Sequence, residues 1–184
     1  MNAFFKPAAL TLAAILSTAV LAATGPVTVG GAPMYATKNI IENAVNSKDH
    51  TTLVAAVKAA GLVDTLQGPG PFTVFAPTNA AFAALPAGTV DNLLQAQNKA
   101  TLTKVLTYHV VAGRMDSAAL MSAIQAAGGK ATLKTVSGGT LWASTDHGHV
   151  MITDESGDTA DVTIADVNQS NGVIHVVDKV LLPK

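Results

Sequence analysis

Between residues 37 and 61, apolar side chains recur every three or four positions, as they do on amphipathic helices that cover a core. Thr37 is placed to cap a first helix. Asp49 or Thr51 can cap a second, which Gly61 ends. The inward positions are then Ile40, Ile41, Ala44 and Val45 in the first helix, and Leu53, Val54 and Val57 in the second.

Helical spacing returns twice further along the chain. A short helix, AAFAAL, is predicted after Thr78 or Asn79. The stretch 89–106 also has helical spacing, but its middle, 95–99, is polar, so we expect two helices with a break between them. The last predicted helix has Asp116 or Ser117 as its cap, Leu120 and Ile124 on its inner face, and Gly128 and Gly129 at its end.

Alternation with period two marks the strands. In PFTVFAP, which ends at Pro77, both faces are largely apolar, so the segment predicts a strand buried on both sides. After residue 130, short alternating runs are separated by turn sequences. They predict strands at about 131–136, 140–144, 149–153 and 160–166, and a last one after Asn171-Gly172. Helices first and strands last indicate an α+β domain with segregated elements.

The amino-terminal segment, residues 1–22, has the composition of a secretory signal peptide. Lys6 precedes an apolar run that is shorter than the roughly 20 residues needed to cross a bilayer, and Val20-Leu21-Ala22 suits cleavage. The glycine- and proline-rich stretch 23–35 predicts a flexible leader, and 36–184 a single globular domain. We therefore expect a secreted chain, periplasmic or extracellular, without a membrane span after cleavage.

Charge and cysteine content narrow the function classes. The chain has 11 basic and 12 acidic side chains, and removal of Lys6 with the signal peptide leaves a net charge of about −2. Without a lysine or arginine cluster, the chain is not suited to nucleic-acid binding. It contains no cysteine, which excludes disulfides, thiol catalysis and a disulfide-linked dimer. We expect a monomer without a cofactor.

The segment TYHVVAGR places Tyr108 beside His109 at the head of an apolar run. Interpreted as a strand, it turns Tyr108 and Val110 to one face and His109 and Val111 to the other. A catalytic histidine needs a nucleophile and an orienting partner, and this run offers neither at alternate spacing. The pattern favours a structural histidine. His175 has a similar apolar setting, and a strand would turn Asp178 to the opposite side, so these two do not form a dyad.

Nitrogen and oxygen ligands gather in TDHGHVMITDESGD, residues 145–158. His147 and His149, on one strand face, could hold a metal ion with Asp154. However, the glycines mark turns, and the acidic run lacks the ligand order of a calcium loop. Solvated turn residues are the alternative interpretation. Trp142, the only tryptophan, lies in a Thr/Ser-rich strand, where both a packed and an exposed position are compatible with the pattern.

Three segments together resemble the fasciclin (FAS1) domain family, in particular its small secreted bacterial members. GPFTVFAPTNAAFAAL at 70–85 is similar to the family's first motif, Tyr108-His109 with VVAG to its central pair, and NGVIHVVDKVLLP at 171–183 to its second motif. The resemblance implies a β-sandwich or wedge of two small sheets with helices along one side. It also implies adhesion without a reaction, through contact with another protein, matrix or carbohydrate, and it points to Tyr108 and His109 as partner-binding residues.

Two alternatives from other classes remain open at this stage. A carrier of a small apolar ligand would need a continuous pocket of several hundred Å³ between helices and sheet. A metal-assisted periplasmic hydrolase would need His147, His149 and Asp154 to converge within ligand distance. Either is decided by side-chain geometry, which the sequence does not contain.

Overall fold

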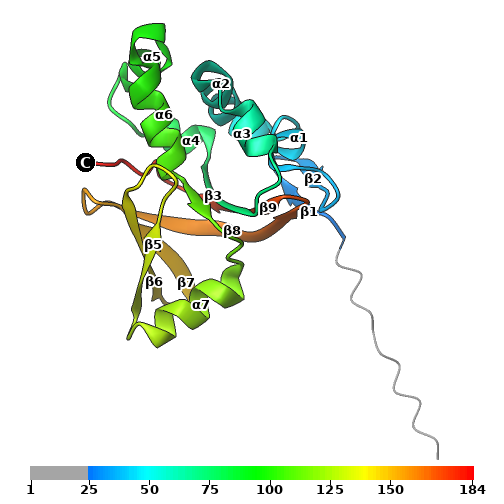
Figure 1. Ribbon diagram of the computed structural model, residues 1–184, viewed down its shortest axis with the longest axis vertical. Helices are drawn as coiled ribbons and strands as arrows, with labels where there is room; N and C mark the ends of the chain where they lie inside the picture. Colours follow the sequence, from blue (N-terminus) through cyan, green and yellow to red (C-terminus); the bar gives the residue numbers. More distant parts are fainter. Residues whose placement is uncertain (1–24) are drawn as a thin grey trace, which may run out of the picture.

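The computed structural model describes residues 25–184. The predicted signal peptide, 1–22, lies outside the described residues. Helices and strands segregate into a wedge, with most helices along one side of a bent sheet and one helix on the other (Figure 1). The predicted α+β class is confirmed.

A seven-stranded sheet forms the frame, in the order β4-β3-β9-β8-β7-β6-β5. Only the β3–β9 pair is parallel; the other neighbours are antiparallel. The strands are β3 (Phe72–Pro77), β4 (Val110–Ala112), β5 (Lys130–Lys134), β6 (Thr140–Asp146), β7 (His149–Thr153), β8 (Thr159–Gln169) and β9 (Gly172–Val177).

The two small sheets implied by the resemblance are two halves of this one sheet, which share the long strand β8. One end of β8 pairs with β7, and the rest pairs with β9 through two register shifts, as expected where a sheet bends. A bridge between Val111 and Thr135 brings the two end strands, β4 and β5, together. The bent sheet therefore approaches a barrel.

The helices begin and end largely where the sequence places their caps. They are α1 (Ile40–Ala44), α2 (Thr51–Ala60), α3 (Val63–Gln67), α4 (Asn79–Ala83), α5 (Thr89–Leu94), α6 (Lys99–Tyr108) and α7 (Ser117–Ala126), with 3₁₀ turns at Lys48–His50 and Ala96–Asn98. Thr78 and Asp116 cap α4 and α7, and Gly61 ends α2 in a left-handed conformation.

Two helix predictions need correction. The first helix is capped by Asn39, whose side chain accepts from Glu42 N–H while the Glu42 carboxylate accepts from Asn39 N–H, so Thr37 lies outside it. Val45, predicted inward, follows the short helix and is exposed. The helix α3 was not predicted, because its five residues are too few to establish a period.

The segment predicted as a flexible leader contains a β-hairpin, β1 (Val27–Val29) and β2 (Ala32–Met34). Val29 and Met34 are buried in the core beside α1. Gly30 and Gly31 both have positive φ, which a two-residue hairpin turn requires. Three-residue strands are too short for alternation to reveal them.

Two hydrophobic clusters fill the wedge. The larger lies between α1, α2, α6 and the β3–β9 half, and includes Leu53, Val57 and Leu106. The other lies between α7 and the β5–β6–β7 half, where Leu120 and Ile124 meet Leu141. The predicted burial of β3 is confirmed, since five of its six residues are buried.

Candidate functional site

The Tyr108-His109 pair lies at the end of a helix rather than in a strand. Tyr108 is the last residue of α6, His109 caps the helix, and β4 starts only at Val110. The strand interpretation of TYHVV was wrong because the helical stripe of Leu102 and Val105 continues into this segment. Both side chains point into the molecule: Tyr108 is 0% exposed and His109 2%.

Both ring nitrogens of His109 are hydrogen-bonded. Nδ1 lies 2.7 Å from the Val105 carbonyl oxygen, and Nε2 accepts from the Leu181 N–H at 2.9 Å. The carbonyl can only accept, so Nδ1 carries the proton and the ring is neutral. Burial lowers the pKa of His109 to about 4, against the opposing effects of the Val105 carbonyl and the Asp154 charge. This histidine has no free nitrogen for a ligand or a reaction.

The Tyr108 hydroxyl connects two loops. It donates to the Thr140 carbonyl at 2.7 Å and accepts from Glu155 N–H at 2.9 Å. The ring lies so close to Gly139 that a Cβ there would come within 2.6 Å of it. Burial raises the pKa of Tyr108 to about 12, so the phenol keeps its proton at neutral pH. Tyr108 thus fixes the start of β6.

The carboxyl-terminal segment 179–184 is held by side chains from two other parts of the chain, α6 with its cap and the loop after β7. We call this group the tail clamp: Lys104, His109, Asp154 and Glu155. His109, Asp154 and Glu155 accept from the backbone N–H groups of Leu181, Leu182 and Lys184. Lys104 donates to the Lys184 carbonyl at 2.7 Å.

The carboxylates of the tail clamp also hold the loop that they lie in. Asp154 is 1% exposed, and its other oxygen accepts from the N–H groups of Ser156 and Asp158. Glu155 accepts from Thr140 N–H, and this bond, with the one from Lys184 N–H, lowers the pKa of Glu155. Sequence reasoning did not assign the bonds to Thr140, Leu182 and Lys184, because these donors are far from the two carboxylates in the chain.

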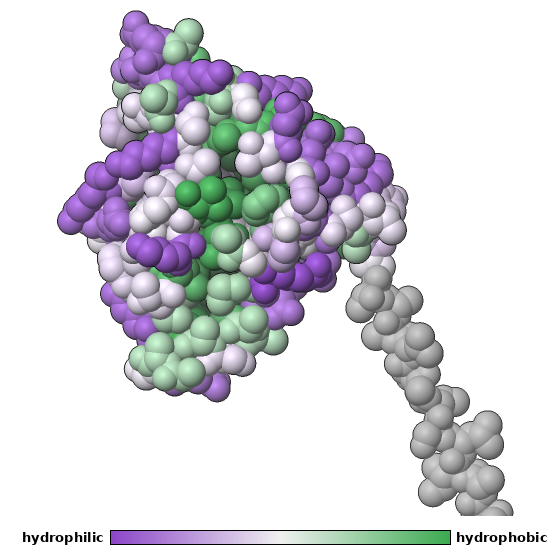
Figure 2. All heavy atoms as spheres, in the orientation of Figure 1, coloured by the Kyte–Doolittle hydropathy of each residue, from purple (hydrophilic) through white to green (hydrophobic). Residues whose placement is uncertain are grey.

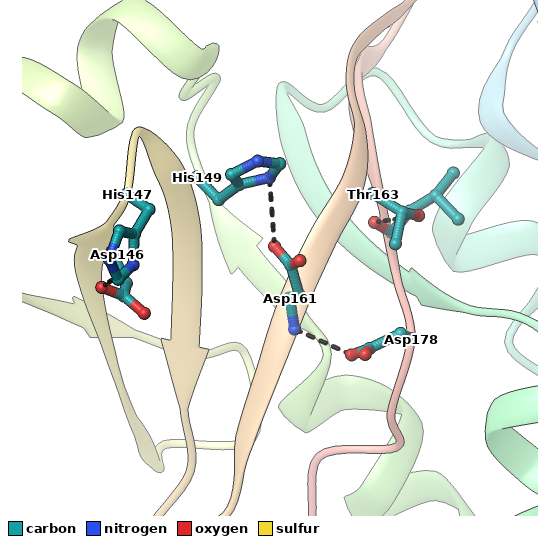
Figure 3. Close-up of polar contacts among 7 residues, drawn as sticks. Asp146, His147, His149, Asp161, Thr163 and Asp178 are labelled. Carbon is teal, nitrogen blue, oxygen red and sulfur yellow. Dashed lines mark hydrogen bonds and ion pairs between the residues drawn. The ribbon is translucent and has the colours of Figure 1, made fainter.

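The three proposed metal ligands do not converge. Asp154 belongs to the tail clamp, whereas His147 pairs with Asp146 at the hairpin tip, Nδ1 to Oδ1 2.7 Å (Figure 3). His147 and His149 do not share a strand face, because His147 and Gly148 form the turn between β6 and β7 with positive φ at both residues. The hydrolase hypothesis therefore lacks its ligand set.

His149 reaches toward Asp161 on β8, with 3.8 Å between Nδ1 and Oδ1 (Figure 3). Asp161 N–H in turn donates to Asp178 at 2.8 Å. Between residues 25 and 184, no group of three or more His, Asp or Glu side chains is arranged to hold a metal ion.

His175 and Asp178 lie apart as predicted: His175 is buried, and its Nε2 bonds the Met115 carbonyl.

The largely apolar cavities between the helices and the sheet are small. Two lie beside α1 and α2, each of about 30 Å³, which is room for a single water molecule. Apolar residues also gather on the face seen in Figure 2, between the helices and α7, but the groove lined by Leu62, Phe72 and the 45% exposed Val136 measures about 20 Å³. Larger hollows of about 490 and 320 Å³ lie beside the β1–β2 hairpin and between α7 and strands β7 and β8, and both are lined in part by polar side chains such as Asp166 and His149. The carrier alternative therefore stays a hypothesis.

The sheet half β5–β8 presents a regular polar surface to solvent. Its inward residues meet α7, and its outward residues are exposed or half-buried. Strand register sets the outward side chains in rows; one row is Thr132, Trp142, Thr153 and Thr159, and the next is Lys130, Ser144, Met151 and Asp161. We call these two rows, with Lys134 and Thr140 beyond them, the outer face.

Trp142 lies inside this array and is half-buried. The ammonium of Lys130 lies over its ring, 5.0 Å from the centroid. The sequence indicated Trp142 as a possible contact residue, but it did not reveal the lysines beside it, because that adjacency depends on the β5–β6 register.

A comparison with protein families matches residues 48–183 to the fasciclin domain. This chain belongs to the fasciclin family. The resemblance drawn from the three segments is thereby confirmed, and the fasciclin domain covers most of the described residues.

Bacterial and animal relatives extend this assignment. Protein sll1483 of Synechocystis is 49% identical over 78% of this chain and 73% of its own length. Immunogenic protein MPB70 of Mycobacterium bovis is 36% identical over 87% of this chain and 75% of its own. The pig transforming growth factor-beta-induced protein ig-h3 is 38% identical over 71% of this chain, which corresponds to 17% of that protein.

A solved structure agrees in fold. A FAS1 domain pair from the insect cell adhesion molecule fasciclin I superposes with a TM-score of 0.69 and 20% identity, covering 79% of this chain. This chain spans about half of that two-domain structure. Among the described residues, no helix of this fasciclin domain is long and apolar enough to cross a membrane.

Proposed function

We propose that this fasciclin domain is a secreted binding module that contacts a macromolecule at the cell surface or in the surrounding matrix, without catalysing a reaction. Two similar proteins support this, the insect cell adhesion molecule fasciclin I and the cell surface glycolipoprotein MPB83 of Mycobacterium bovis. The signal peptide predicted for residues 1–22 fits such a location. The saturated hydrogen bonds of His109 and His175 fit a role without acid–base chemistry.

The outer face is the observation that carries the proposal. It is broad and regular, and its one large aromatic, Trp142, is half-buried among hydroxyl-bearing side chains. Tryptophan is enriched at binding surfaces, because its ring offers a large apolar contact area and its N–H can donate a hydrogen bond. A monomer would therefore offer a partner a single copy of this face.

Tyr108 and His109 enter the proposal as positioning residues. Both are buried, so a partner that docks on the surface does not touch them. Tyr108 holds Thr140, which lies two residues before Trp142 on the outer face. Replacing Tyr108 should therefore weaken binding by loosening β6. His109 holds the carboxyl-terminal segment through its bond from Leu181 N–H, so its replacement should act on that segment.

Attachment of the purified domain to extracellular material tests the proposal. The domain, residues 23–184, is labelled and applied to cells and matrix; we expect retention that Trp142→Ser removes. Val45→Ser, at an exposed apolar residue on the helical side, serves as the matched control and should bind like the wild type. Absence of retention by the wild-type domain would contradict the binding role. Equal retention of both variants would show that the contact does not involve the outer face.

A further inference from the structure

Two lysines on the outer face flank Trp142. Lys130 and Lys134 both point outward from β5, with Thr132 between them. Thr132 pairs directly with Trp142 on β6, so the backbone position of Trp142 lies midway between the two lysines along the strand, and the Lys130 ammonium lies over the indole. Four residues of extended chain separate the lysines by about 13 Å.

Neither lysine is neutralised by the protein. None of the ion pairs formed within residues 25–184 includes Lys130 or Lys134, and both residues are exposed. Lys134 makes a long contact to the Gly138 carbonyl, 3.4 Å, and Lys130 lies over the tryptophan ring. Acidic side chains also lie near this face. Asp146 follows Ser144 on the outward side of β6 and pairs with His147. Glu155 accepts from Thr140 N–H opposite Lys134. The two charged side chains of β5 itself are nevertheless both positive, in a chain whose net charge is −1.

The surroundings of the indole are polar and flat. Thr132 and Thr153 are its cross-strand neighbours, and Thr140 and Ser144 precede and follow it on the same face of β6. A protein hot spot typically seats an aromatic anchor in an apolar, water-excluding pocket, which this surface does not provide. Hydroxyl groups, a flat indole and separated cations instead complement a chain of sugar rings that carries acidic groups.

We propose that the β5–β6 part of the outer face binds a linear polysaccharide that carries carboxylate groups. A sugar ring stacks on Trp142, since its C–H groups are weakly positive and the face of the indole is negative. Carboxylates along the chain pair with Lys130 and Lys134, and the threonine and serine hydroxyls bond the sugar hydroxyls. Lys130 exchanges its contact with the indole for one with a carboxylate. The inference rests on the proposed binding function and names the class of partner.

Isothermal titration with oligosaccharides of defined length tests this pairing. An oligoguluronate hexamer is the acidic probe, and maltohexaose is the neutral one. We expect the wild-type domain to bind the acidic probe, with an affinity that falls as salt rises, and to bind the neutral probe at least about tenfold more weakly.

Variants separate the charges from the ring. Lys130→Gln with Lys134→Gln should weaken binding of the acidic probe about tenfold and remove most of its salt dependence. The matched control, Lys58→Gln with Lys99→Gln, makes the same charge change on the helical side at two exposed lysines and should leave the affinity unchanged. Trp142→Ser should weaken binding of the acidic probe as strongly as the lysine pair.

Three outcomes would overturn the inference: equal affinity for the two probes, an affinity that the lysine changes on β5 do not alter, or a wild-type dimer in size-exclusion chromatography that Trp142→Ser converts to monomer. If attachment to extracellular material still depends on Trp142 while the acidic probe fails to bind, the partner class is wrong and the binding function stands. If neither the probe nor extracellular material is retained, both fail.

Discussion

The tail clamp and the outer face use similar side chains in opposite ways. In the tail clamp, His109, Asp154 and Glu155 point inward, and each of their hydrogen-bonding atoms described above has a backbone partner. On the outer face, Lys130 and Trp142 contact each other and are otherwise available to solvent. One group holds distant segments of the chain together, and the other is presented to the surroundings.

This difference shows why residue type alone points to the wrong place. A histidine beside a tyrosine, and carboxylates in a loop, are typical of catalytic sites, but a buried polar group whose bonds are all made cannot accept a ligand without losing one of them. On the outer face, by contrast, lysine, threonine and tryptophan side chains are open to solvent and can contact a partner. We therefore assign stability to the tail clamp and contact to the outer face.

The largest expected effect on stability concerns the buried residues next to the tail clamp. Phe75 is 0% exposed, stacks on His175 and donates its N–H to the His109 carbonyl. Phe75→Ala should lower the free energy of unfolding by about 3 to 5 kcal/mol, because it leaves a cavity in the core. Urea denaturation measures it; a midpoint equal to that of the wild type would contradict the buried position of β3.

An effect of intermediate size is expected from the titration of His109. The pKa of His109 is about 4 in the folded protein and near 6.5 in the unfolded chain. Between these two pH values the unfolded state binds more protons than the folded state, so the free energy of unfolding decreases as the pH falls. The contribution of neutral His109 is complete above pH 6.5 and is lost progressively down to pH 4, by about 3 kcal/mol.

Urea unfolding at pH 7.5 and 4.5 measures this loss. His109→Ala should be less stable at pH 7.5 and should lose less stability on acidification than the wild type. His147→Ala, at a histidine whose side chain is 90% exposed, is the control and should follow the wild type at both values. Equal pH dependence in the wild type and His109→Ala would show that the clamp histidine does not titrate as the geometry requires. His50 and His175, whose pKa values are also lowered by burial, add to the slope, and Glu155, whose pKa is lowered by its hydrogen bonds, adds to it at the acidic end.

Much of the fold followed from the sequence because it is encoded locally. The caps at Thr78 and Asp116, the stop at Gly61 and the turns between the late strands depend on a few neighbouring residues. What was missed is short or non-local. The β1–β2 hairpin has three-residue strands, and the end of α6 at Tyr108 is decided where the helix meets β4 and the tail.

The candidate site was predictable only in part for a related reason. Trp142 was noticed as the single tryptophan, but its neighbours come from two other strands and are set by register. His147 and His149 were expected on one strand face, although Gly148 was already interpreted as a turn residue; the turn also includes His147, which removes it from the strand that carries His149. The sequence therefore identified candidate residues such as Trp142, but the register of the strands determines which side chains lie next to one another.

The smallest expected effect on stability tests the outward side. Trp142→Ser removes a half-buried ring from a solvent-facing strand and leaves no buried polar atom without a partner. We expect the free energy of unfolding to fall by about 1 kcal/mol or less, the size of a cross-strand pair, while attachment is lost. Denaturation of this variant beside Phe75→Ala gives the contrast directly. A loss of several kcal/mol from Trp142→Ser would place the tryptophan with the tail clamp as a structural residue, because a side chain that serves contact should be separable from folding.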